Sequence, residues 1–396
     1  MSVGELTMKV YGKGETYIRI IGMLYAIISF IAGYFIGIFR LFKDNYGYHA
    51  IFLNPWYHVH SFLMIFGFLG GLLMTERIVG TRTLPWQNRF MISLSMISLS
   101  IIGLIMLTSG WALSIPFIAI TGGIFLFISS SLFTYFIYKL AILSHDYQSF
   151  MIMAAGTTSL GVSSILAMLY LPVNDYPFIL LMLSFPLLFV VGERIELSRF
   201  KFVGMNFKKS FILVISWSYV FILSVSASLF YKSYSYSILL LTISGFLLLS
   251  VIFIVFYMDR VAAVTVKQHR LSRYLYISIT IAYIWAIIGI VFFILRSNGV
   301  TGFYDPGIHA IALGFIVTFI FAHGALIFPT LLNKKLNVSK LSYWPLIILT
   351  TANVMRIGGD LIKLYVPVGY NITNISGIVF GISAIWFVAN MYSMMH

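Results

Sequence analysis

Twelve apolar runs, each long enough to cross a lipid bilayer, constrain this chain more than any other feature of its sequence. About 20 residues of helix cross a hydrocarbon core of about 30 Å. The division between the third and fourth runs, near Thr108–Trp111, is short. The pattern predicts an all-α membrane protein with about twelve transmembrane helices in a single bundle. The runs lie near residues 17–40, 57–75, 90–108, 112–139, 149–171, 176–192, 211–230, 236–257, 274–295, 306–332, 342–365 and 370–392.

Few residues in the chain suit a water-exposed surface. Of its 396 residues, 60% are hydrophobic and only 9% are charged. Lipid must therefore cover most of the outside, and the bilayer is the first expected partner. No long hydrophilic insert separates the runs, so we expect one polytopic domain over residues 1–396. The first sixteen residues are too polar for a secretory signal, and we expect the first span to stay in the mature chain.

The basic residues segregate to one side of the predicted membrane. Of 25 lysines and arginines, nineteen lie at the termini or in the connections that share their side, and one lies inside a span. The positive-inside rule then places both termini in the cytoplasm, which fits a plasma-membrane protein. The net charge of +14 thus indicates topology, and no nucleic-acid partner is expected. The basic residues on the opposite side are Arg40, Lys43, Lys232, Arg296 and Lys363.

Ionisable residues inside the spans are the best indicators of function, because burying one without a partner costs several kcal/mol. Span two begins with His58 and His60, and span ten carries His309 near its start. His58 and His60 point about 200° apart on a helix, so only one faces the interior, and we favour the deeper His60. Two facing helices that each offer an imidazole at matched depth meet the requirement for bis-histidine haem ligation. The alternative is that each histidine hydrogen-bonds to a neighbouring helix.

A second haem is a further hypothesis. His323 follows His309 by fourteen residues, about 21 Å deeper and about 40° away on an ideal α-helix. The residue fourteen positions beyond His60 is Met74, so a His/Met haem is conceivable there. The chain has no cysteine, which excludes covalent c-type attachment, iron–sulfur clusters and thiolate metal sites.

Span eleven carries Asn353, Arg356 and Asp360 within its apolar run. Arg356 and Asp360 are four residues apart, so they share a face. An arginine at this depth can hold haem propionates through bidentate hydrogen bonds. The equally open alternative is a self-neutralising Arg356–Asp360 pair without a ligand.

Charged residues also end spans two and six. Glu76-Arg77 ends span two, and Gly192-Glu193-Arg194 ends span six. We expect interhelical ion pairs at both places, in preference to a proton or metal site.

The stretch from His60 to Arg77, the Gly192-Glu193-Arg194 segment and the stretch from His309 to Pro329 resemble the NnrS-like membrane proteins. That group resembles, distantly, the catalytic subunit of haem-copper oxidases. The resemblance implies haem b held by His60 and His309. It also implies an association with tolerance of nitric oxide. Oxidases carry copper-binding histidines on helices six and seven, but residues 176–192 and 211–230 contain none. We therefore expect no copper-dependent oxygen-reducing centre.

The sequence thus predicts a haem-binding membrane protein, either a cytochrome b-like electron carrier or a nitric-oxide-related protein. Catalysis is left undecided, and an enzyme of this type would be an oxidoreductase, with quinol or redox subunits as partners. Two alternatives stay open. One is a secondary transporter with a midplane site at Asn353, Arg356 and Asp360. The other is a structural subunit of a respiratory complex.

The predicted topology is testable with single cysteines, because the natural chain contains none. Ser2→Cys and Ser272→Cys should resist an impermeant thiol reagent in intact cells, since both positions are predicted to be cytoplasmic. Asn298→Cys, in a connection predicted to be external, should react. Labelling of either cytoplasmic position in intact cells would reverse the orientation.

Overall fold

The computed structural model describes residues 3–46, 59–81, 86, 88–168, 176–198, 207–230, 234–259, 270–324 and 340–394. Within these ranges every regular element is a helix, and twelve helices are long and apolar enough to cross a membrane. The predicted all-α class and the number of spans are therefore confirmed. The chain is a multi-pass membrane protein whose apolar outer surface contacts lipid.

The chain divides into two compact units. Unit 1 comprises residues 1–43 and 47–189, and unit 2 comprises residues 44–46 and 190–396. Each unit is described by itself below. The single domain expected from the sequence stays a prediction.

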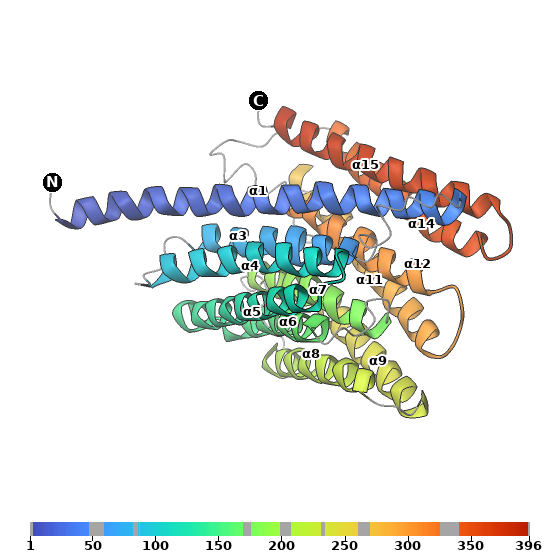
Figure 1. The fold of residues 1–396 in the computed structure, drawn as a ribbon, viewed down its shortest axis with the longest axis horizontal. Helices are drawn as coiled ribbons and strands as arrows, with labels where there is room; N and C mark the ends of the chain where they lie inside the picture. Colours follow the sequence, from blue (N-terminus) through green and yellow to red (C-terminus); the bar gives the residue numbers. More distant parts are fainter. Residues whose placement is uncertain are drawn as a thin grey trace. The chain divides into compact units, whose positions relative to one another are not determined.

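Unit 1 begins with an unusually long helix, drawn in blue in Figure 1. Helix α1 has 44 residues, roughly 66 Å at 1.5 Å per residue, and its apolar part is Thr16–Phe42. A turn at Leu113–Ile115 separates the third and fourth spans, a little later than expected from the sequence. Ser114 adopts a positive φ of 56° there, and Pro116 starts the next helix. The helices are α1 (Val3–Tyr46), α2 (His60–Phe62), η2 (Leu63–Leu69), α3 (Gly70–Gly80), α4 (Arg89–Ala112), α5 (Pro116–Ser144), α6 (Tyr147–Met168) and α7 (Tyr176–Ser198), whose last turns belong to unit 2.

Unit 2 contains the remaining spans. Its last two long helices, α14 and α15, form an antiparallel hairpin, shown in orange and red in Figure 1. Helix α11 packs against α9, α12 and η4, and α12 also contacts α14. The helices are α8 (Phe207–Phe230), α9 (Tyr234–Met258), α11 (Arg270–Ser297), α12 (Tyr304–His309), η4 (Ala310–Val317), η5 (Lys340–Tyr343), α14 (Trp344–Ile362) and α15 (Val368–Met394).

Spans two and ten share an irregularity. Each starts with a short α-helical piece, continues as a π-helix and then returns to an α-helix. The π segments are η2, of seven residues, and η4, of eight residues. His60 lies just before η2, and His309 lies directly before η4. Because π-helical turns are rare and are often found at functional sites, both segments direct attention to these two histidines.

Close backbone packing joins α4 to α5 and makes Gly122 a sensitive position. A Cβ on Gly122 would collide with the backbone nitrogen of Leu107, whereas a Cβ on Gly161 would meet ordinary contacts from 3.7 Å outward. We expect Gly122→Ala to destabilise the protein by about 1–3 kcal/mol through overpacking. Gly161→Ala should be neutral or stabilising by up to about 1 kcal/mol, because alanine favours helices. Thermal unfolding in detergent measures both, and equal melting temperatures would contradict the packing argument.

Candidate functional site

His309 ends α12, where its imidazole hydrogen-bonds to its own helix. Its Nδ1 lies 2.9 Å from the backbone oxygen of Asp305, one turn earlier. A carbonyl oxygen only accepts hydrogen bonds, so Nδ1 carries a proton, and in the neutral ring the lone pair is then on Nε2. That tautomer is the one in which Nε2 binds a metal ion, with the other ring nitrogen oriented by a carbonyl. His309 is half-buried.

His60 has the same kind of support in unit 1. Its Nδ1 lies 2.7 Å from the backbone oxygen of Gly33 on α1. A Cβ on Gly37 would lie 2.9 Å from the ring, so glycine at that position lets the imidazole pack closely on α1. In its neutral form His60 therefore also carries its lone pair on Nε2. His58 lies outside the described residues, so the preference for His60 over His58 stays a prediction.

Asp360 is the centre of a charged cluster on α14. Its Oδ2 lies 3.1 Å from Nε of Arg356, but without the alignment of a hydrogen bond. Its Oδ1 accepts a 2.6 Å hydrogen bond from Nζ of Lys363. The Asp360 side chain is 1% exposed and the Arg356 side chain 8%. The Arg356–Asp360 pair that the sequence left open as an alternative is thus present, but Lys363 makes the better-aligned contact with Asp360.

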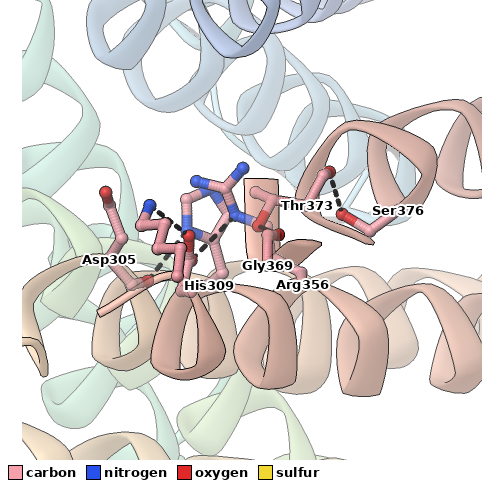
Figure 2. Close-up of polar contacts among 8 residues, drawn as sticks. Asp305, His309, Arg356, Gly369, Thr373 and Ser376 are labelled. Carbon is pink, nitrogen blue, oxygen red and sulfur yellow. Dashed lines mark hydrogen bonds and ion pairs between the residues drawn. The ribbon is translucent and has the colours of Figure 1, made fainter. Parts of the chain in front are cut away.

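The charged cluster faces the histidine helix. Helix α12 packs on α14, and Figure 2 shows Asp305, His309 and Arg356 projecting into one region between them. The Asp305 carboxylate is close enough to act electrostatically on Asp360. The structure therefore brings together His309 and Arg356, two of the residues predicted to hold the cofactor.

Asn353 lies one turn before Arg356 and is fully buried. Within the described part of the chain, neither the nitrogen nor the oxygen of its amide has a hydrogen-bond partner. It faces η4, because a Cβ on Gly314 would lie 2.6 Å from Nδ2 of Asn353. A buried amide without partners costs about 1–3 kcal/mol, so a group outside this set of side chains is expected to satisfy it.

The evidence for a second haem is weaker. His323 contacts the ring of Phe319, with the ring centres 6.1 Å apart, and Met74 is buried in unit 1. The 40° separation between His309 and His323 assumed an unbroken α-helix. Because η4 intervenes and a π-helix turns less per residue, that angle is wrong. The second haem stays a prediction, but the shared helix face of His309 and His323 no longer supports it.

The charges that end spans two and six have different surroundings. Arg194 donates two 2.8 Å hydrogen bonds to Asp259, which follows α9. Tyr283 on α11 donates a third, at 3.3 Å, to the same carboxylate. The interhelical ion pair expected at the end of span six is therefore confirmed. Arg77 lies over the rings of Phe150 and Phe189, 5.9 and 5.6 Å from their centres.

Sequence reasoning missed two members of the site and one structural feature. Lys363 follows Asp360 by three residues, a spacing that favours an ion pair, but the sequence indicates it only as a basic residue on the external side of the membrane. Asp305 precedes His309 by four residues, and this i−4 spacing could have indicated the backbone contact. Nothing in the sequence pattern signals the π segments.

One further observation concerns metal sites other than haem. Within the described residues, no group of three or more histidine, aspartate or glutamate side chains could hold a metal ion. A haem needs only one or two protein ligands, so this finding does not bear against it. The resemblance to NnrS-like proteins stays a prediction.

Nearly the whole chain matches the model of one protein family. Residues 19–395 match the model of a domain of unknown function, DUF8744. No protein of curated function matches the sequence. Because the match covers far more than half of the chain, this protein belongs to the DUF8744 family.

Proposed function

We propose that this protein binds haem b within the membrane, with Nε2 of His309 as an axial ligand and Arg356 at a propionate. The observation that carries the proposal is the pairing of an imidazole, oriented through Nδ1 by a backbone carbonyl, with a buried arginine on the helix packed against it. His309 offers a neutral nitrogen of the correct tautomer. Arg356 offers a planar fork of donors that matches a carboxylate.

The residues fit the cofactor electrostatically. Burying an arginine in an apolar span is costly unless a negative group accompanies it. Asp360 supplies one negative group but also pairs with Lys363, and Asp305 supplies a second one nearby. A haem propionate near Arg356 would give its Nε the aligned hydrogen-bond acceptor that Asp360 does not provide. The side chains of Asp305 and Lys363 are both half-buried.

His60 is proposed as the second axial ligand. The support is its matching tautomer and its matching place before a π segment, together with the helix order predicted from the sequence. A haem with two imidazole ligands supplies one-electron transfer, and one with an open position supplies nitric oxide binding. The proposed role is therefore electron transfer with a quinol or a redox subunit, or a nitric-oxide-related function. The proposed location is the plasma membrane, with both termini cytoplasmic.

One observation favours a second candidate function. The buried, unpartnered amide of Asn353 lies one turn from Arg356, which is also how a site for a small anionic solute would look in a secondary transporter. The absorption spectrum of the purified protein separates the two, since a transporter site carries no Soret band.

We expect the purified protein to show the spectrum of low-spin b-type haem. His309→Ala and His60→Ala should each abolish the low-spin signal, because each removes an axial nitrogen. Spectra of the oxidised and the dithionite-reduced protein measure this. His145→Asn is the control, since His145 is exposed and its positive φ suits asparagine. Full haem occupancy in the double His60/His309 variant would refute the assignment.

The role of Arg356 is tested separately. Arg356→Leu should weaken haem retention about tenfold to a hundredfold, the usual loss for a charge-assisted hydrogen bond of about 1.5–3 kcal/mol. It should also lower the reduction potential, because a nearby positive charge favours the reduced iron. Adding Asp360→Leu should not restore retention, since the propionate still lacks its donors.

Haem content and a redox titration of the single and double variants measure these effects. Arg296→Leu is the matched control, an arginine on α11 that lies outside the candidate site. A double Arg356/Asp360 variant with parental haem content would show that the arginine serves only Asp360.

A further inference from the structure

Asn353 is the least satisfied buried group next to the proposed haem site. It is 0% exposed, and both polar atoms of its amide lack partners among the described residues. Its neighbour on the facing helix is Gly314, where any side chain would meet the amide nitrogen. Glycine thus makes room for the asparagine without providing a partner.

The chemistry of the amide restricts what can satisfy it. Oδ1 requires a donor and Nδ2 offers two, so the complementary group must both donate and accept. An un-ionised carboxylic acid does this with its O–H and its C=O, forming a ring of two hydrogen bonds with a primary amide. An ionised carboxylate only accepts and would leave Oδ1 unsatisfied.

The spacing along α14 restricts the ligand further. Residues three apart on a helix have Cβ atoms about 5–6 Å from one another, so Asn353 and Arg356 present two acid-binding groups side by side. Haem carries two propionic acid groups on neighbouring corners of one edge. Two acids held this close in a buried site do not readily ionise together, because like charges repel. Arg356 suits the ionised one, and Asn353, which has no charge, suits the neutral one.

We infer that Asn353 binds one haem propionic acid in its protonated form, while Arg356 binds the other as a carboxylate. This inference rests on the proposed function, since it requires haem at the site. It assigns a binding role to Asn353 and a protonation state to the ligand. A water molecule at the amide is the competing explanation.

The test uses the full-length protein loaded with haem labelled with ¹³C at both propionate carboxyl carbons. Infrared spectroscopy at neutral pH should show one protonated-acid carbonyl band that shifts with the label. Asn353→Leu should remove this band and weaken haem retention by roughly tenfold, as expected for a lost pair of hydrogen bonds. Asn390→Leu is the matched control, because Asn390 is a buried asparagine on α15 that also has an unpartnered amide nitrogen.

The outcomes separate this inference from the proposed function. Haem bound through His309 but without a label-sensitive acid band would overturn the inference alone. An unchanged band in Asn353→Leu would also overturn the inference alone. If that variant fails to fold, the parent protein still tests the protonated propionic acid, because the absence of its band overturns the inference. A parent protein that holds no haem at all would overturn both.

Discussion

Hydrogen-bond donors are the scarce groups inside a membrane-spanning helix, and the polar features of this protein depend on that scarcity. Every backbone N–H in the middle of a helix is already bound, while each carbonyl oxygen keeps a second lone pair. Buried hydroxyls are therefore easily satisfied, as Ser163 and Ser164 are by the carbonyl one turn earlier. A buried acceptor has no such solution and needs a donor from a side chain or a ligand.

The buried acceptors of unit 2 meet this problem differently. Asp360 receives a hydrogen bond from Lys363 and an ion-pair contact from Arg356. Asp259 is the acceptor of three bonds from Arg194 and Tyr283. His309 donates through Nδ1 to the backbone oxygen of Asp305. The structure thus brings donors to these carboxylates, whereas the amide of Asn353 has no hydrogen-bond partner among the described residues.

The sequence predicted the fold well because hydropathy over about 20 residues reports directly on the cost of exposing backbone to lipid. All twelve spans exist, and most ends differ from the prediction by a few residues. It also predicted the Arg356–Asp360 contact, which follows from helical spacing alone. It missed the role of Lys363, which depends on how the end of α14 is formed. It could not predict η4, because no local residue preference marks a π turn, and the angle between His309 and His323 was wrong for that reason.

The orphaned amide distinguishes the region around His309 from simple helix packing. If Asn353 served only to join two helices, it would be expected to hydrogen-bond across the interface, as buried asparagines in membrane bundles do. Instead it packs on Gly314, which has no side chain that could bond to it. Replacing this asparagine with leucine would remove an unsatisfied group and should stabilise a protein without a ligand. A stability gain in the haem-free protein, together with a loss of haem retention, is the combination that packing alone does not produce.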